Sequence, residues 1–303
     1  MAEILQKDGM WTFDGDTIRI VPGRERGVHV MRQTVGELAV PLVAVAGIAF
    51  EPGRKSGRLR LRLRDGADPL SQVTRGRLAD AADPYQLAVE SDRSGVAEYF
   101  VDEVRNALLL EQVPTGSTDR YLLPGPGVPL SVGAGDGTVA FDGERVRLEW
   151  NWTTEESKSS AGPQVLPLSQ IASVEWLPSS GLENGYLRFT VTGAQPKLSP
   201  KHDPYAVELF GFKKDPLMAL AAAAVTVRMP HPYAPVAPVA ETAVPALAPG
   251  GERGAAAAPA AGNQDADHDA LLRRLRELGD LRHAGVLTEE EFSAAKQAVL
   301  KRF

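Results

Sequence analysis

The chain carries the stretch GMWTFDGDTIRI at residues 9–20 and a related stretch, GTVAFDGERVRL, at residues 137–148. In both stretches a Phe-Asp-Gly triplet stands between runs in which apolar and polar residues alternate. Alternation with a period of two is typical of a strand with one buried face, and a central Asp-Gly pair is typical of a tight turn. We therefore expect each stretch to form a β-hairpin.

Three further blocks of sequence recur in the same order after these hairpins, between 120 and 128 residues further along the chain. The first copies are residues 40–52, 57–61 and 83–85, and the second copies are residues 166–178, 185–189 and 203–205. Self-similarity of this kind is the signature of a repeated structural unit. The sequence therefore predicts a duplicated domain.

Each copy is expected to consist of several strands followed by one helix. An apolar stripe at helical spacing predicts a helix over 95–110, and the equivalent helix over 215–226 begins with Asp215, which we expect to cap the N–H groups that follow it. The expected fold class is mainly β (α+β): two tandem pleckstrin-homology-like (PH-like) β-barrel domains, each closed by a C-terminal helix. Alternation and turn residues predict the strands of the first copy at about 10–14, 17–22, 27–32, 45–50, 58–64 and 85–90.

Changes in composition divide the chain into five predicted segments. Residues 1–112 and 131–228 are the two PH-like repeats, and residues 113–130, rich in proline and glycine, are the linker between them. Residues 229–264 contain seven prolines, many alanines and few charges, which is typical of a disordered linker. Residues 265–303 return to apolar periodicity and predict a helical hairpin.

The predicted hairpin has one apolar face. Thr288 and Glu291 form a capping box at the start of its second helix. A hairpin this short buries too little apolar surface to be stable alone, so we expect its apolar face to bind a second copy of the chain or another protein. The residues expected to make that contact are Leu271, Leu275, Leu278, Leu281, Phe292 and Val299.

Two parts of the chain resemble known families. Leu275, Leu278 and Leu281, followed by GVLTEEEF at residues 285–292, resemble the short C-terminal domain known as SHOCT. The Phe-Asp-Gly and Asp-Pro-Tyr blocks are similar to those of an uncharacterised actinobacterial family with a duplicated domain of unknown function. The first resemblance implies a role in oligomerisation or interaction, and the second brings no catalytic residues with it.

Arg58, Arg60, Arg62 and Arg64 alternate with leucines in one predicted strand, which places the four guanidinium groups on one face. Guanidinium groups match phosphate oxygens, so this face is a candidate site for phosphate or for an anionic lipid headgroup. The alternative is a solvated strand face without a ligand, because charge also protects a sheet edge from aggregation.

The overall composition limits the remaining functions. The chain has 303 residues, no cysteine and a net charge of -6. The lack of cysteine excludes disulfides, thiolate metal sites and cysteine nucleophiles, and an acidic chain is not expected to bind nucleic acid. The five histidines are scattered, and no phosphate-binding loop or dinucleotide fingerprint occurs. We expect no metal, no cofactor and no enzymatic activity.

The apolar residues are not arranged for insertion into a membrane. No apolar run reaches 18 residues, and the first residues lack the features of a secretory signal, so we expect a cytoplasmic protein without a transmembrane segment. The inner face of the membrane is the alternative location. Trp150 and Trp152 are expected to lie on one strand face and to be buried in the core or at the junction of the repeats. The alternative is an exposed pair of indoles that serves as a protein-binding platform.

The favoured function is a non-enzymatic binding or scaffold protein. Its tandem PH-like domains would become multivalent through the C-terminal hairpin, so that weak contacts add into avidity. Two alternatives stay open. One is a peripheral membrane protein that binds anionic lipid through the Arg58–Arg64 face, and the other is an enzyme with a site between the repeats.

Overall fold

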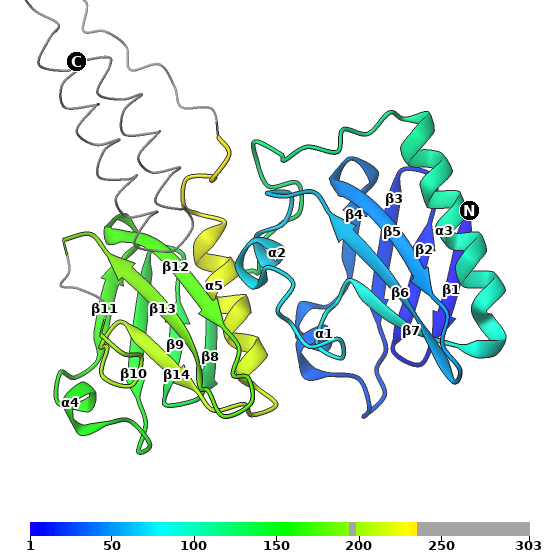
Figure 1. The fold of residues 1–303 in the computed structure, drawn as a ribbon. Coiled ribbons are helices and arrows are strands. Elements are labelled where there is room, and N and C mark those ends of the chain that lie inside the picture. The colour runs from blue at the N-terminus through cyan, green and yellow to red at the C-terminus, as the bar shows by residue number, and fades with distance from the viewer. Residues whose placement is uncertain (194–197, 235–303) are drawn as a thin grey trace, which may run out of the picture. The chain divides into compact units, whose positions relative to one another are not determined.

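The computed structural model describes residues 1–193 and 198–234. Within these ranges the chain forms four antiparallel sheets and a few helices (Figure 1). Both predicted repeats lie almost entirely within them. The predicted hairpin and its association residues lie outside the described residues: Leu271, Leu275, Leu278, Leu281, Phe292 and Val299.

The first repeat consists of a four-stranded sheet, a three-stranded sheet and a long final helix. The strands follow each other in chain order, β1-β2-β3-β4 in one sheet and β5-β6-β7 in the other, and α3 packs against β1, β5 and β7. The strands are β1 (Ala2–Gln6), β2 (Gly9–Phe13), β3 (Thr17–Pro22), β4 (Leu38–Pro41), β5 (Val45–Glu51), β6 (Ser56–Leu63) and β7 (Gln86–Glu90). The helices are α1 (Val30–Val35), α2 (Pro69–Thr74) and α3 (Ser94–Leu110).

The second repeat has the same strand order, with sheets β8-β9-β10-β11 and β12-β13-β14 followed by α5. Its strands are β8 (Leu130–Ala134), β9 (Gly137–Phe141), β10 (Arg145–Trp150), β11 (Gln164–Pro167), β12 (Ile171–Leu177), β13 (Gly185–Val191) and β14 (Ala206–Leu209). Its helices are α4 (Glu156–Ser159) and α5 (Met218–Thr226). The prediction of a mainly β chain with a duplicated domain is therefore confirmed.

The two Phe-Asp-Gly triplets form the same turn. Asp14 Oδ1 accepts hydrogen bonds from the backbone N–H groups of Asp16 (3.0 Å) and Thr17 (2.8 Å). Asp142 Oδ1 accepts the equivalent bonds from Glu144 (2.8 Å) and Arg145 (2.7 Å). Because these N–H groups stabilise the charged carboxylate, the pKa values of Asp14 and Asp142 lie below the ordinary value for aspartate.

The final helices of the two repeats have different surroundings. In the first repeat, α3 buries Phe100 edge-to-face against Trp11, with ring centroids 6.3 Å apart, and its other face is exposed at Tyr99 and Leu109. In the second repeat, every residue of α5 from Met218 to Val225 is buried.

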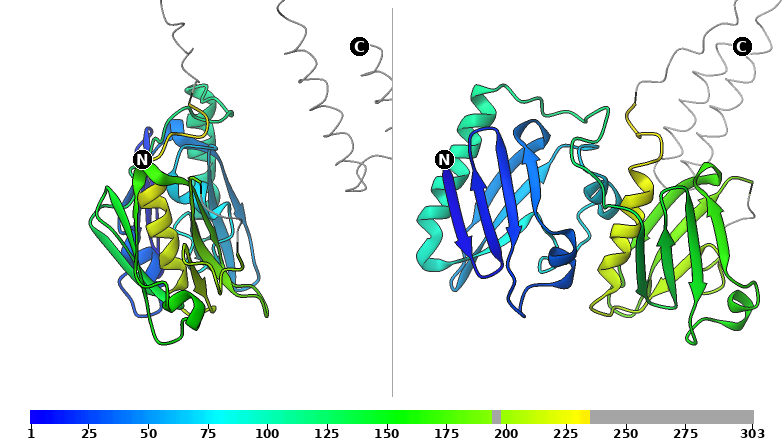
Figure 2. Two further views of the ribbon diagram at one scale, coloured as in Figure 1. Left: turned by 90° about the vertical axis from the view of Figure 1, so that its left-hand side faces the viewer. Right: turned by 180° about the vertical axis from the view of Figure 1, so that it is seen from behind.

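The reason for this burial is that α5 is covered from two sides. One side packs on the sheets of its own repeat, and α2 of the first repeat packs on it as well (Figures 1 and 2). Leu70 and Val73 of α2 therefore belong to the core cluster of the second repeat. Charged side chains are unfavourable on a helix that is buried all round, which explains why residues 218–225 of α5 are all Ala, Leu, Met or Val.

Some local predictions were wrong. The strand expected over 27–32 is instead the start of α1, whose N-cap His29 accepts a hydrogen bond through Nδ1 from the Met31 N–H (3.1 Å). Asp215 does not cap the residues that follow it, because its Oδ2 accepts bonds from the preceding N–H groups of Gly211 (2.7 Å) and Phe212 (3.1 Å). The strands β1 and β4 and the helix α2 were not predicted.

The two neighbouring tryptophans have opposite environments. Trp150 ends β10 half-buried, and its Nε1 donates to the Gly162 carbonyl (2.8 Å). Trp152 lies in the following turn and is 94% exposed, so the prediction that it is buried was wrong. The strand ends at Trp150, which removes the alternation that would have placed both indoles on one face.

Candidate functional site

The predicted arginine face lies on β6, the central strand of the sheet β5-β6-β7. The leucines of β6 are buried, and Arg58, Arg60 and Arg62 occupy the opposite face. Arg64 follows the strand, and its guanidinium donates to the carbonyls of Val43 (2.9 Å), Gly116 (2.8 Å) and Ser117 (3.3 Å). Through these hydrogen bonds, Arg64 connects the inter-repeat linker to the first repeat.

Two of the other arginines already have a counter-ion. Arg58 Nη2 lies 2.6 Å from Asp80 Oδ2, and Arg60 Nη2 lies 4.0 Å from Asp80 Oδ1. Asp80 comes from the segment between α2 and β7. Within the described ranges, no hydrogen bond or ion pair involves the side chain of Arg62. The structure therefore leaves one of the four guanidinium groups unpaired, and ligand binding on this face stays a prediction.

A cavity of about 430 Å³ lies beside Arg58 and is also lined by Asp8, Arg32, Asp80 and Gln86. Arg32 is only 6% exposed. Its Nη2 donates to the Asp80 carbonyl (3.0 Å), but its buried Nε has no hydrogen-bond partner. Burial lowers the pKa of Arg32, and the carboxylates of Asp8, Asp83 and Asp80 oppose that shift.

Gln86, which also lines this cavity, carries an unpaired acceptor. It is 6% exposed, and its Nε2 donates to Asp83 Oδ2 (2.7 Å). Its Oε1 is buried and has no hydrogen-bond partner. Buried polar groups are almost always paired, so an unpaired donor and an unpaired acceptor on two residues that line one cavity indicate a place for a polar ligand or for water. We call this cavity, with Arg32 and Gln86, the open polar site.

The second repeat contains a closed network of charges. Lys158 Nζ donates to Asp136 Oδ2 (2.6 Å) and to the Pro200 carbonyl (3.2 Å), and it lies 4.6 Å from the centroid of the Trp150 ring. Arg188 Nε donates to Asp203 Oδ2 (2.9 Å). Burial raises the pKa of Asp136 and lowers the pKa of Lys158, and the hydrogen bond between them opposes both shifts.

The same four positions are charged in the first repeat. The strand registers align Asp136 with Asp8, Arg188 with Arg60 and Asp203 with Asp83, and the offset of β11 from β4 aligns Lys158 with Arg32. The Arg188 side chain is 7% exposed, whereas the Arg60 side chain is 47% exposed. In the second repeat the acidic and basic side chains at these positions therefore pair with each other. In the first repeat, where the open polar site lies, the equivalent side chains do not form these pairs.

The sequence analysis missed this set of four positions. Part of the signal was available, because three of the four positions lie in or directly beside a recurring block and all four keep their sign of charge in both copies. Arg32 and Lys158 lie between two blocks, each eight residues before the second. The sequence does not show that in the first repeat Arg58 pairs with Asp80 and Asp83 accepts a hydrogen bond from Gln86. Both pairings depend on how the segment after α2 folds back.

Other kinds of site find no support in the described part of the chain. It contains no group of three or more His, Asp or Glu side chains that could hold a metal ion. Among the described helices, none combines the length and the apolar character required to cross a membrane.

The duplication is also evident from comparison with known proteins. The profile of one family matches residues 11–105 and again residues 139–226, one match in each repeat. Together the two matches cover more than half of the chain. No curated protein matches this sequence. The chain belongs to the family described as Domain of unknown function (DUF4429), and it contains two copies of that domain.

Proposed function

We propose that this chain is a non-enzymatic binding or scaffold protein whose two repeats are PH-like domains. A four-stranded and a three-stranded antiparallel sheet followed by one helix, present in both repeats, support the PH-like assignment. The packing of α2 on α5 supports the view that the two domains act as one binding unit.

The open polar site is the observation that carries the proposal. The second repeat places charges at the same four positions and neutralises them internally, so the fold does not require this region to stay open. The first repeat instead leaves Arg32 Nε and Gln86 Oε1 buried and unpaired beside a cavity. Leaving buried polar groups unpaired is unfavourable, which supports a ligand that pairs with them.

The chemistry of the open polar site favours a neutral polar group. Arg32 Nε needs an acceptor, and Gln86 Oε1 needs a donor. Arg32 and Arg58 are balanced by Asp8, Glu51 and Asp80 around the cavity, so a strongly charged ligand gains no net attraction. An amide group supplies one donor and one acceptor, as in the backbone of a protein partner.

The two alternatives stay predictions with weaker support. Lipid binding through Arg58–Arg64 is weakened by the pairing of Arg58 with Asp80 and of Arg64 with three carbonyls. For an enzyme between the repeats, the buried Asp68 is the natural candidate. However, Asp68 caps α2 and accepts bonds from Ser71 and from the Tyr85 hydroxyl (2.9 Å), so a structural role accounts for it.

The proposal also holds that the C-terminal hairpin makes the chain multivalent, and a measurement of its mass in solution tests this part. His231 Nε2 lies 2.9 Å from the Gly66 carbonyl, and its ring meets that of Tyr121 edge-to-face, so a truncation must keep this segment. We expect light scattering to show an oligomer for the full chain and a monomer for a chain ending at Ala234. A monomeric full chain, or an oligomeric truncation, would contradict self-association through the hairpin.

A further inference from the structure

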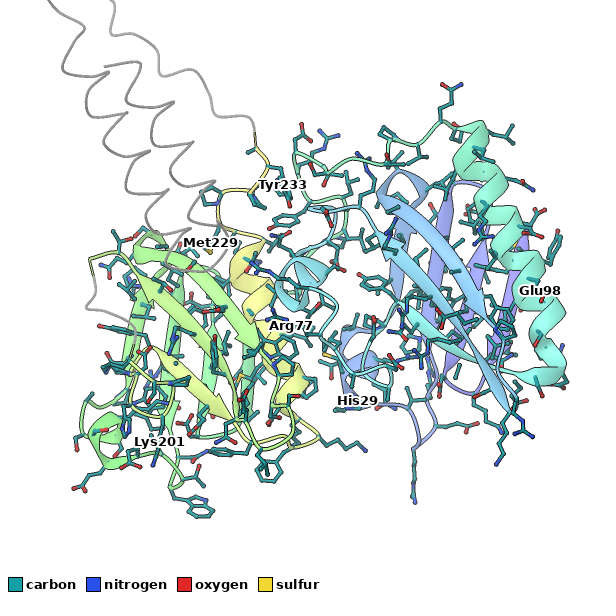
Figure 3. All side chains as sticks on the ribbon, viewed as in Figure 1. His29, Arg77, Glu98, Lys201, Met229 and Tyr233 are labelled. Carbon is teal, nitrogen blue, oxygen red and sulfur yellow. The ribbon has the colours of Figure 1, made fainter. Side chains whose placement is uncertain are left out.

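A second cavity lies where the two repeats meet. It has a volume of about 410 Å³ and is lined by residues of α2 and the segment after it, by residues of β12 and by Tyr121 of the linker. Thr226 of α5 and the following Met229, Pro230 and Pro232 complete the lining. We call it the junction cavity. Arg77 and Met229, which are labelled in Figure 3, are two of its lining residues. It shares no residue with the cavity of the open polar site.

Three lining residues carry buried polar atoms that have no hydrogen-bond partner. These atoms are Trp176 Nε1, Tyr121 Oη and Thr226 Oγ1. The indole N–H can only donate, and both hydroxyls can donate. Burial raises the pKa of Tyr121, so that its hydroxyl keeps its proton. A ligand that satisfied all three atoms would therefore offer several acceptor oxygens.

The fold itself does not need the indole N–H of Trp176. Trp176 pairs with Leu187 across β12 and β13, as Phe50 pairs with Leu59 across β5 and β6 in the first repeat. A phenyl ring thus serves at the equivalent position of the other copy. Trp176 is only 2% exposed, and a buried N–H without a partner is unfavourable. Its presence in the second repeat alone indicates a partner that the first repeat lacks.

The lining of the junction cavity includes two exposed arginines. Arg75 and Arg77 are exposed, and in the described part of the chain neither side chain forms a hydrogen bond or an ion pair. Arg75 has a φ of 48°, a left-handed conformation that normally favours glycine at the end of a helix, here α2. The one acidic lining residue is Glu175, and burial together with that carboxylate raises the pKa of the adjacent Tyr186.

We propose that the junction cavity binds the phosphate group of a small soluble molecule. Two exposed guanidinium groups and three unpaired N–H or O–H donors, all carried by lining residues, match the terminal oxygens of a phosphate. The volume is larger than a phosphate needs and lies within the usual range for small-molecule sites, so an organic part fits as well. This proposal is independent of the open polar site and of oligomerisation.

The test uses the full chain and two probes, inorganic phosphate and phenyl phosphate, at constant ionic strength. The indole N–H signals of the four tryptophans are followed by ¹H–¹⁵N NMR, with Trp176 assigned through Trp176→Phe. We expect a saturable shift of the Trp176 signal with both probes and tighter binding of phenyl phosphate. The absence of a saturable shift would overturn the proposal.

Matched variants separate a built site from general attraction between charges. Arg75→Ala with Arg77→Ala should weaken binding at least tenfold, whereas Arg24→Ala with Arg26→Ala, which removes the same charge elsewhere, should change it less than twofold. Equal losses in the two double variants would overturn the site. If Trp176→Phe fails to fold, Thr226→Val provides the second variant, since it removes one wall hydroxyl and keeps the shape, and it should weaken binding severalfold.

Two further probes test the ligand class. Benzoate should bind at least tenfold more weakly than phenyl phosphate, and equal affinity would replace phosphate by carboxylate as the ligand. Co-sedimentation with phosphatidylglycerol vesicles should not depend on Arg75 and Arg77. A loss of vesicle binding in the Arg75→Ala, Arg77→Ala variant would assign these arginines to a lipid surface and overturn the small-molecule proposal.

Discussion

Lys158 and Asp136 form an ion pair in the second repeat, with Nζ 2.6 Å from Oδ2 and with side chains that are 0% and 1% exposed. Their equivalents in the first repeat, Arg32 and Asp8, form no ion pair with each other, although both line one cavity. The same pair of opposite charges thus stabilises one copy of the domain from within and lines an open polar site in the other.

Breaking the buried pair should strongly destabilise the protein. Lys158→Met leaves Asp136 buried without its counter-ion, and we expect a loss of about 3–5 kcal/mol in the free energy of unfolding. Arg147→Met breaks the exposed pair with Glu149 and should cost less than about 1 kcal/mol. Urea unfolding of both variants checks this, and similar losses would mean that burial does not distinguish the two pairs.

The hairpin turns should contribute to loss of stability in acid. The folded state lowers the pKa values of Asp14 and Asp142, so their contribution is complete above the unfolded value of about 3.9 and is lost as the pH falls through the folded values. In Asp14→Asn with Asp142→Asn, the side chains keep an accepting oxygen but do not titrate. We expect a smaller fall in Tm between pH 5 and pH 2 than in the wild type; an unchanged fall would place the acid sensitivity elsewhere.

A charge placed between α2 and α5 should disrupt the shared core. Val73 is 8% exposed and belongs to the core cluster of the second repeat. Val73→Asp is expected to lower the free energy of unfolding by about 3–5 kcal/mol, because the carboxylate would be buried without a counter-ion. Leu109→Asp, on the exposed side of α3, is the control and should change it by less than about 0.5 kcal/mol. Comparable stability of the two variants in urea would contradict the shared core.

The open polar site should bind a minimal amide. We expect N-methylacetamide, titrated into the full chain, to shift the Arg32 Nε–H signal in ¹H–¹⁵N spectra in a saturable manner. Gln86→Glu is the matched variant, since it keeps the shape and the acceptor but adds a charge and removes the Nε2–H bond to Asp83. That variant should bind the amide at least several-fold more weakly, and identical titrations would indicate that Gln86 does not take part.

The duplication, the hairpins and the final helices follow from local pattern. A period of two and an Asp-Gly turn specify β2-β3 and β9-β10 without help from the rest of the chain. Residues 27–32 show where this reasoning fails: their alternation resembles a strand, yet His29 caps α1 and turns the backbone into a helix. Alternation over six residues does not distinguish the two when a capping side chain is present.

The candidate sites depend on contacts between residues distant in the sequence. Period-two alternation was enough to place Arg58, Arg60 and Arg62 on one face, because that placement is a property of the strand alone. Asp80 decides whether Arg58 and Arg60 are free, and it reaches these two side chains only after the chain has folded back from α2. Likewise, the unpaired N–H of Trp176 comes to lie on the same cavity lining as Arg75 and Arg77 only when the two repeats pack together. Strands and turns depend on interactions among a few neighbouring residues, so the local sequence determines them. Burial, ion pairing and cavities depend on contacts between residues that are distant in the sequence, so only the tertiary structure decides them.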